Sequence, residues 1–436
     1  MLDAIVEGLM ARSELKAWSV RHMKSRSAQQ YDLQAVTEAV RSVERERIIV
    51  NVLRETSNAE GEQRVGAGNV TLLPGEDISK ALDEAAFMAS LVHNEPYNFP
   101  EPTPLPEISI ADNQMQGNPD ESVRVILSRL KAGAAKNPSV RLTAAECTTS
   151  ETITRIVNSR GIDAQQASTK LHLEWVLIAG KDEAEVESFV RLDRRRISDL
   201  NIEAVLARRM QRAADLLIAK KPPNYSGPVI VGGEALAEMM NSSVLQILSS
   251  AQFKYSGETP WEIGQSIFRA EVQGDAFTMW ANRQLPYGTN SNRFDGEGIR
   301  AQRVELVREN ELRAFTASQR FANYLDLPVT GAFGNIEIAP GSTSAEELAK
   351  LPHIEVAEFS WFNPDSLSGE FACEIRLGTI VDGEKRTTFK GGMLVGNLLD
   401  ALANVHWSSE TGFYGNYLGP VTARFNDLTV AGETSG

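Results

Sequence analysis

The sequence predicts an α+β protein with an N-terminal α/β region, a middle α+β region and a strand-rich C-terminal domain that has a few helices. Three observations support this prediction. The chain has 436 residues, enough for two or three domains, and 42% of them are hydrophobic, as in ordinary globular proteins. Helix-like and strand-like periodicities are mixed along the first half. The second half carries mostly strand-like segments.

The first region, residues 1–112, is expected to form an N-terminal domain. It opens with a pattern typical of an amphipathic helix, and residues 77–93 have helical spacing with Asp77 or Ser79 as the cap. Alternating segments predict strands at residues 17–23, 48–53 and 63–73. Five prolines between residues 94 and 106 exclude a regular element, so this segment is expected to be a linker or an extended crossing strand.

The second region, residues 113–223, is expected to form a central domain. Apolar residues at helical spacing predict helices at 120–135 and 202–220, and Pro222 and Pro223 close the region. The strands predicted between these helices lie at residues 140–147, 151–158, 170–179 and 185–193.

The third region, residues 224–436, is expected to form a strand-rich domain. Its predicted strands lie at residues 228–231, 301–307, 354–362, 369–377, 385–395 and 422–430. Helices are expected at residues 234–250, 309–325 and 397–405.

The composition bounds the possible partners. A formal net charge of -14 repels phosphate backbones, so we expect no nucleic-acid partner. No apolar run approaches the roughly 18 residues that span a bilayer, so we expect no membrane association. The two cysteines, Cys147 and Cys373, form no close pair and are expected to stay reduced. Together these features predict a cytoplasmic location.

The segment around residues 229–240 is the first candidate site. An apolar strand runs into a helix that begins near Gly233, and Glu234 and Glu238 lie one helical turn apart. Two carboxylates at this spacing can work as an acid and a base, but they more often share a solvated face. The simpler interpretation is an amphipathic helix with Leu236 and its apolar neighbours facing a core.

Three further segments are possible cleft or turn positions. The glycine turn that contains Asp295, Gly296 and Gly298 leads into a strand, and the pair Gly396-Asn397 ends a strand and opens a helix. Glycine at such points permits a positive φ or a close backbone approach. His406 follows a predicted helix and is a further cleft candidate.

Taken in order, these segments resemble the TldD/PmbA family, which was long described as a modulator of DNA gyrase and is now described as a zinc peptidase system. The segments that carry the resemblance are residues 195–200, 228–231, 294–298, 317–331, 369–371, 396–398 and 428–432. Their order and spacing are far more specific than any single motif. The resemblance covers most of the chain and is strongest from about residue 194 to 432.

The chain departs from the zinc-bearing members of this family. TldD-type subunits carry H-E-x-x-x-H on the helix, and they complete the zinc site with a cysteine near the C-terminus. Here Gly233 and Glu238 occupy the two histidine positions, Glu234 keeps the position of the glutamate, and residues 412–417 contain no cysteine. The chain therefore resembles the PmbA-type subunits, also called TldE, which lack the zinc motif.

The resemblance implies a subunit of a heterodimeric metallopeptidase that cleaves short or unfolded peptides. A TldD-type partner would supply the zinc and the catalysis, while this chain would bind no metal or other cofactor and would have no catalytic residue of its own. The leading alternative is a stand-alone peptide-binding or scaffold homodimer without catalysis. Two others are a regulator that contacts gyrase directly and a metal site rebuilt from Glu234, Glu238 and His406.

Overall fold

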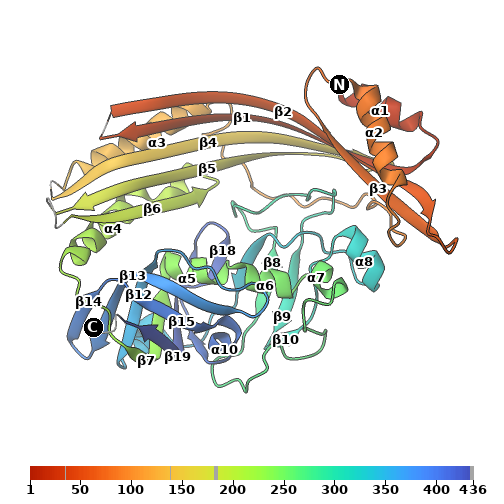
Figure 1. The fold of residues 1–436 in the computed structure, drawn as a ribbon. Helices are drawn as coiled ribbons and strands as arrows, with labels where there is room; N and C mark the ends of the chain where they lie inside the picture. Colours follow the sequence, from red (N-terminus) through yellow and green to blue (C-terminus); the bar gives the residue numbers. More distant parts are fainter. Residues whose placement is uncertain (35, 138, 181–184, 433–436) are drawn as a thin grey trace.

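A computed structural model describes residues 1–34, 36–137, 139–180 and 185–432. The fold is α+β and strand-rich, which confirms the fold class expected from the sequence. In Figure 1 a long, arched sheet forms one layer, and the unit built from residues 224–432 lies against it as a second layer. Within the described ranges, no helix is both long enough and apolar enough to cross a bilayer.

The N-terminal sheet has six strands in the order β3-β2-β1-β4-β5-β6, and neighbours are antiparallel. The strands are β1 Leu15–Leu33, β2 Val36–Ser57, β3 Gln63–Leu72, β4 Val140–Asn158, β5 Asp163–Ala179 and β6 Val186–Arg194. β1 has 19 residues and β2 has 22, well beyond the predicted segments, because pairing continues where both faces are polar and the hydrophobic alternation is lost. The strands predicted at 140–147 and 151–158 are one strand, β4.

The long sheet crosses the predicted boundary at residue 112. β1 pairs with β2 on one side and with β4 on the other, where the register runs from Ser19 opposite Asn158 to Leu33 opposite Ala144. Residues before and after position 112 therefore contribute to the same sheet. The proline-rich segment 94–106 forms no helix or strand, as expected, and it is held to the sheet where Asn158 Nδ2 donates to Pro100 O at 2.8 Å.

Four helices accompany this sheet: α1 Leu2–Met10, α2 Ile78–Ser90, α3 Pro119–Ala134 and α4 Ile202–Leu217. The helices predicted at 77–93, 120–135 and 202–220 are thereby confirmed. They pack on one face, where Val20 and Ala28 of β1 are buried in clusters with α2 and α3. Because side chains alternate along a strand, the odd-numbered residues of β1 point to the other face, which we call the helix-free face.

The C-terminal unit contains two sheets. In the larger one β12 pairs with both β7 and β13, so the ring β12-β7-β19-β15-β13 closes on itself. Its strands are β7 Tyr225–Gly232, β12 His353–Phe359, β13 Glu370–Asp382, β14 Lys385–Phe389, β15 Met393–Asn397, β16 Val405–Trp407 and β19 Thr422–Ala431. The smaller sheet holds β8 Met279–Asn282, β9 Arg303–Arg308, β10 Glu311–Leu312, β11 Asn335–Ile338, β17 Thr411–Phe413 and β18 Tyr417–Pro420.

The helices of this unit are short: α5 Gly233–Met240, α6 Ser243–Leu248, α7 Ala251–Tyr255, α8 Gln319–Leu325, α9 Ala345–Leu348 and α10 Leu398–Ala403. The prediction of a single helix at 234–250 is wrong, because the helix is interrupted between Met240 and Ser243. Asn241 Nδ2 donates to Ala237 O at 2.8 Å, and Ser242 takes an extended ψ of 155°. Asparagine and serine side chains compete with helical hydrogen bonds in this way.

Two other predictions in this region are corrected. The helix predicted at 309–325 is shorter in the structure, where only α8 is helical. Glu309 and Asn310 have φ values of 48° and 72° and turn the chain from β9 into β10. The strand predicted at 385–395 is two strands, β14 and β15. Gly391 and Gly392 separate them with φ values of 82° and 79°, which L side chains rarely adopt.

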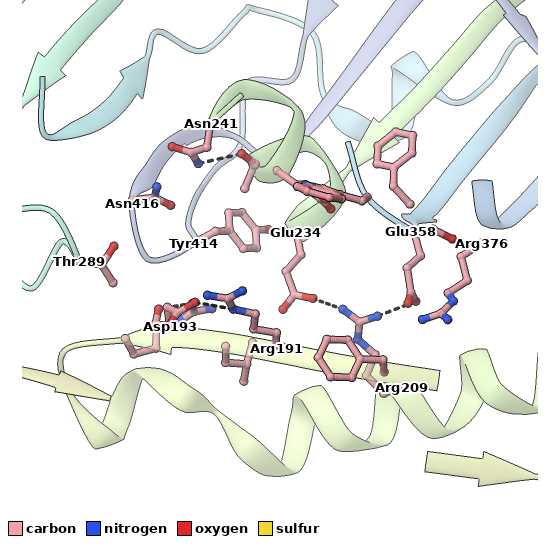
Figure 2. A pocket seen from close by; sticks show the side chains of 18 residues that line it. Arg191, Asp193, Arg209, Glu234, Asn241, Thr289, Glu358, Arg376, Tyr414 and Asn416 are labelled. Atoms are coloured by element: carbon pink, nitrogen blue, oxygen red, sulfur yellow. Dashed lines mark hydrogen bonds and ion pairs between the residues drawn. The ribbon is translucent and has the colours of Figure 1, made fainter. Parts of the chain in front are cut away.

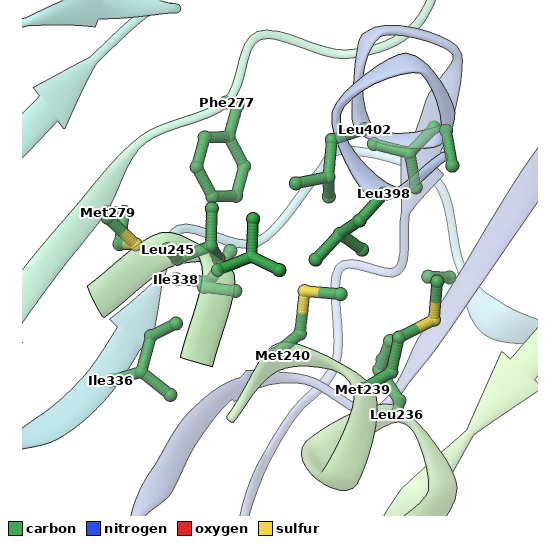
Figure 3. Packing of buried hydrophobic residues seen from close by; sticks show 14 of the residues in the cluster. Leu236, Met239, Met240, Leu245, Phe277, Met279, Ile336, Ile338, Leu398 and Leu402 are labelled. Carbon is green, nitrogen blue, oxygen red and sulfur yellow. The ribbon is translucent and has the colours of Figure 1, made fainter. Parts of the chain in front are cut away.

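A large hydrophobic core holds the two C-terminal sheets and the short helices together. Figure 3 shows Leu236, Met239 and Met240 of α5 packed towards Leu398 and Leu402 of α10, and all five side chains are fully buried. Burial of such side chains contributes about 1.5–3 kcal/mol each. This packing fixes the orientation of α5, so that its other face points away from the core.

Candidate functional site

The candidate site begins at the junction of β7 and α5. Val229 and Val231 are buried in β7, and the chain then turns into α5 through Gly232 and Gly233. The N–H of Gly233 donates to Val421 O at 2.8 Å, and its φ of 59° lies in the left-handed region. Glycine is favoured in this conformation because it has no Cβ.

Glu234 is held by arginines of α4. Arg209 Nη2 lies 2.6 Å from Glu234 Oε2, and Arg208 Nη2 lies 3.5 Å from Glu234 Oε1. The same guanidinium reaches β12, where Arg209 Nη1 lies 2.6 Å from Glu358 Oε2. Figure 2 shows Arg209 between the two carboxylates. This triad joins the N-terminal half to the C-terminal unit.

The arginines keep Glu234 ionised. Burial by itself would raise the pKa of Glu234, but the charges of Arg209, Arg208 and Arg194 outweigh that effect, and the pKa lies below its ordinary value. A carboxylate stabilised in this way is a weak proton acceptor, because protonation would cost the ion pairs.

Glu238 lies one turn further along α5. Its Oε1 accepts a hydrogen bond from the N–H of Phe362 at 3.0 Å. Although the side chain is exposed to the cavity, the surrounding protein desolvates the carboxyl and raises its pKa, and the negative charge of Glu358 adds to this. The two glutamates therefore have opposite pKa shifts. The difference between the two pKa shifts is caused by the residues around each carboxyl, and not by the spacing of the two glutamates along the helix.

Glu234 and Glu238 line a cavity of about 490 Å³ between the N-terminal sheet and the C-terminal unit (Figure 2). A second cavity of about 360 Å³ adjoins it, because both are lined by Asp193, Arg194, Thr289 and Asn416. One wall of this pair is the helix-free face of the sheet, and the other wall comes from the loops of the C-terminal unit. The two cavities form a groove that carries charged side chains of both signs, among them Asp193 and Arg194.

Other lining residues come from distant parts of the sequence. The wall of the larger cavity also carries Arg191 and Phe189 of β6, Trp361, Arg376 of β13 and Tyr414. Trp361 is 71% exposed, which is unusual for an indole. The Arg376 guanidinium makes no hydrogen bond or ion pair within the described part of the chain.

The residues at this site do not fit a zinc ion. Gly233 has no donor atom, and both carboxylates of α5 already have partners in Arg209 and the N–H of Phe362. Over the ranges that the structure describes, no group of three or more histidine, cysteine, aspartate or glutamate side chains could hold a metal. His406 does not line the cavity, so the metal site rebuilt from Glu234, Glu238 and His406 is ruled out by the geometry.

His406 lies on β16 and has a structural partner. Its Nδ1 lies 3.3 Å from Asp275 Oδ1, and the other oxygen of Asp275 accepts from the N–H of Trp407 at 2.8 Å. Asn397 also has structural partners. Its Oδ1 accepts from Leu399 N at 2.9 Å and so caps α10, while Gly396 directly precedes it at the end of β15.

The Asp295 turn lies at a different cavity. Asp295 Oδ1 accepts from the N–H groups of Glu297 and Ile299, both at 3.0 Å, and Oδ2 lies 3.4 Å from Arg283 Nη1. Asp295 and Gly296 line a cavity of about 430 Å³. Gly298 has a φ of 91°, and a Cβ there would meet Ile162, so this glycine serves the turn. The structure thus separates these positions from the Glu234 site.

Sequence reasoning missed Arg209 and Glu358. A signal for Arg209 was present, because it occupies a position on the apolar face of α4, in register with Leu206, Met210 and Ala213. A charged residue at such a position must find a buried partner. A signal for Glu358 was present as well, because it falls on the same alternation as the apolar Ile354 and Val356 of β12, and all three are buried.

Residues 224–432 match the family model described as the PmbA/TldA metallopeptidase C-terminal domain. An uncharacterized protein of Methanocaldococcus jannaschii is 24% identical over 266 residues, covering 56% of this chain and 59% of that protein. Metalloprotease PmbA of Escherichia coli is 24% identical over 254 residues, covering 57% of this chain and 55% of that protein. The matches thus span little more than half of each relative.

Solved structures agree over the whole chain. TldE from Thermococcus kodakarensis has a TM-score of 0.83 at 17% identity and covers 99% of this chain and 100% of its own. A Thermotoga maritima protein, described as a proposed modulator of a DNA gyrase, has a TM-score of 0.84 at 19% identity, with the same coverage. At such identities the likeness shows the fold.

Proposed function

This chain is a member of the PmbA/TldD family, whose C-terminal domain it carries at residues 224–432, and we propose that it is the non-metal-binding subunit of a heterodimeric zinc metallopeptidase. The observation that carries this proposal is the ion pair between Arg209 and Glu234. Glu234, at the position of the motif's glutamate, forms an ion pair with an arginine and is therefore a weak proton acceptor. Gly233 and Glu238 stand at the positions of the two histidines that would bind the metal. A TldD-type partner would supply the zinc, the ligands and the base.

We further propose that this chain contributes part of a peptide-holding chamber, with the C-terminal unit as interface and wall. The groove between the helix-free face and the C-terminal loops supports a polypeptide ligand, because two adjoining cavities carry charged side chains of both signs. Exposed Trp361 adds an apolar surface beside the charges. Short or unfolded peptides suit such a groove, since an extended main chain can reach many polar groups at once.

The acidic composition supports a complex that works without nucleic acid. A reducing cytoplasm suits the two buried, unpaired cysteines Cys147 and Cys373. We include a cytoplasmic location and the absence of membrane and nucleic-acid partners in the proposal.

Native mass spectrometry of the tagged chain, isolated from its own cells with zinc counted in the same sample, tests this function. The expected result is a complex with a second chain of similar size that carries H-E-x-x-x-H, with one zinc ion per pair. Co-expression of the two chains should then give peptidase activity that neither has alone. A metal-free homodimer or monomer from the same cells would contradict the proposal and favour the stand-alone binding protein.

A further inference from the structure

The long hairpin of β1 and β2 leaves part of a sheet edge open. β3 pairs with β2 only from Ile48 to Ser57, although β2 begins at Val36. Before residue 48, β2 therefore has β1 as its only neighbour among the strands that the structure describes. We call residues 39–47 the open edge, because their register with β1 is regular from Ala39 opposite Tyr31 to Arg47 opposite Met23.

The open edge lacks the backbone features that often protect an edge strand, although five of its nine residues are charged. It contains no proline and no glycine, and its register with β1 is uninterrupted over nine residues, or roughly 30 Å of strand. Every second N–H and C=O group along it points away from β1. Such an edge can accept another extended chain as an added strand.

The acidic and basic residues of the open edge lie on opposite faces of the sheet. On the face that carries the helices, Glu44 and Glu46 have partners on β1. Glu46 Oε1 lies 2.7 Å from His22 Nε2 and 3.5 Å from Lys24 Nζ, while Glu44 Oε1 lies 3.8 Å from Arg26 Nε. The acidic side of the open edge is therefore largely compensated within the molecule.

On the helix-free face the open edge carries Arg41, Arg45 and Arg47, and all three are exposed. None of them forms an ion pair within the described part of the chain. Arg47 Nη2 makes a weak contact with Met23 Sδ at 3.9 Å. Among the described residues, three arginines without an ion-pair partner thus lie on one side of an unpaired strand, in a protein whose net charge is -14.

The charges on the helix-free face indicate which kind of strand could pair with the open edge. In an antiparallel pair within one continuous sheet, directly opposed side chains lie on the same face, and opposite charges there stabilise while like charges destabilise. A second copy of this chain would place arginine beside arginine on the helix-free face. An acidic strand would instead place its carboxylates beside Arg41, Arg45 and Arg47.

We propose that the open edge docks an extended, acidic polypeptide segment, which adds to β2 as a strand and places its carboxylates beside Arg41, Arg45 and Arg47. Main-chain hydrogen bonds supply affinity, and the arginine row supplies the preference for acidic side chains. The site lies on the N-terminal hairpin, away from α5 (Figure 1), and none of residues 39–47 lines the Glu234 cavity. It does not depend on the proposed peptidase role.

Fluorescence anisotropy of the purified full chain with a labelled nonapeptide of alternating glutamate and threonine tests the proposal. We expect saturable binding that weakens about tenfold in Arg45→Glu. The matched control is Arg269→Glu, an exposed arginine of the C-terminal unit with the same charge change. Because both positions are on the surface, circular dichroism should show that both variants remain folded.

Three results would overturn the proposal. The first is equal binding of a nonapeptide of alternating lysine and threonine. The second is equal binding of a glutamate–threonine peptide N-methylated at alternate residues, in each of the two alternations, because strand addition requires those N–H groups. The third is preference for a single-stranded oligonucleotide of equal charge, which would assign the arginine row to phosphates. Self-association of the purified chain without any peptide binding would also contradict the proposal and would make the occupant a second copy.

Discussion

Arg209 Nη2 of α4 lies 2.6 Å from Glu234 Oε2 of α5. This contact joins the N-terminal half to the C-terminal unit at the one acidic position that the chain shares with the metallopeptidase motif. Arg209 is 6% exposed and also reaches Glu358. The ion pair gives the Glu234 carboxylate a structural role, because one guanidinium links α4 to both α5 and β12.

Replacement of Arg209 should be strongly destabilising. Arg209→Met removes the close cation of both Glu234 and Glu358 and leaves them only the longer contacts with Arg208 and Arg212, at 3.5 and 3.8 Å. Loss of one partner in such a mostly buried network costs about 3 kcal/mol. Urea denaturation at neutral pH measures this loss. Arg208→Met is the control, because this 49% exposed side chain lies 3.5 Å from Glu234 and should cost less than about 1 kcal/mol. Equal losses in the two variants would contradict the bridging role.

The stability difference between wild type and Glu234→Gln should depend on pH. The folded state lowers the pKa of Glu234 below its usual 4.5, so this carboxylate stabilises the fold above that pH. The benefit should disappear as the pH falls through the lowered pKa. Denaturant midpoints of both proteins between pH 7 and pH 3 should therefore converge on the acidic side, and a constant difference would count against the shift.

Glu238→Gln should behave in the opposite way. Burial raises the pKa of Glu238, so its charged form is penalised in the folded state at neutral pH. The amide can still accept the hydrogen bond from Phe362 N without that charge. We expect the variant to be more stable than wild type at pH 7 and equal to it at acidic pH, in the same denaturation series. A loss of stability at pH 7 would show that the carboxylate is needed there.

Arg195 should be a second point of attachment between the halves. It is 5% exposed and donates to five backbone carbonyls, including those of Gly288, Thr289 and Ser291 at 2.6–2.8 Å. Burial lowers its pKa to about 10, so it stays charged at neutral pH.

Arg195→Met removes these donors and should cost about 3 kcal/mol or more, because buried acceptors lose their partners. Thermal or urea unfolding measures the loss. Arg196→Met is the matched control, since its ion pair with Asp199 and its contact with the Tyr287 ring lie at the surface. A comparable loss at position 196 would refute the attachment role of Arg195.

Gly233 should resist substitution for a backbone reason. Its φ of 59° would strain an L residue. Space is not the obstacle, because a Cβ added at this position would meet only Tyr414 Oη, at 3.8 Å. Gly233→Ala should cost about 1–2 kcal/mol and Gly233→Asn less, because asparagine tolerates this conformation. Melting temperatures of the two variants give the comparison. An alanine variant as stable as wild type would show that the turn relaxes.

Local patterns in the sequence were sufficient for several elements. The spacing of Leu236, Met239 and Met240 correctly predicted a buried helix face, and the clustered prolines of residues 94–106 correctly excluded regular structure. The end of that helix was missed, because Asn241 breaks it through a side-chain bond to Ala237. The hairpin tip was missed as well, since pairing between two polar strands leaves no hydrophobic alternation to detect.

The sequence by itself determined the fold class, the family resemblance and the absence of the two motif histidines at positions 233 and 238, because these depend on residue type and on short-range spacing. Only the tertiary structure decided what Glu234 does. Its partner Arg209 lies 25 residues away, and Glu358 lies 149 residues from that arginine. The strength of an ion pair depends on the distance between the two charges and on their removal from water. Both are set only when the N-terminal half and the C-terminal unit pack together around the Arg209 guanidinium.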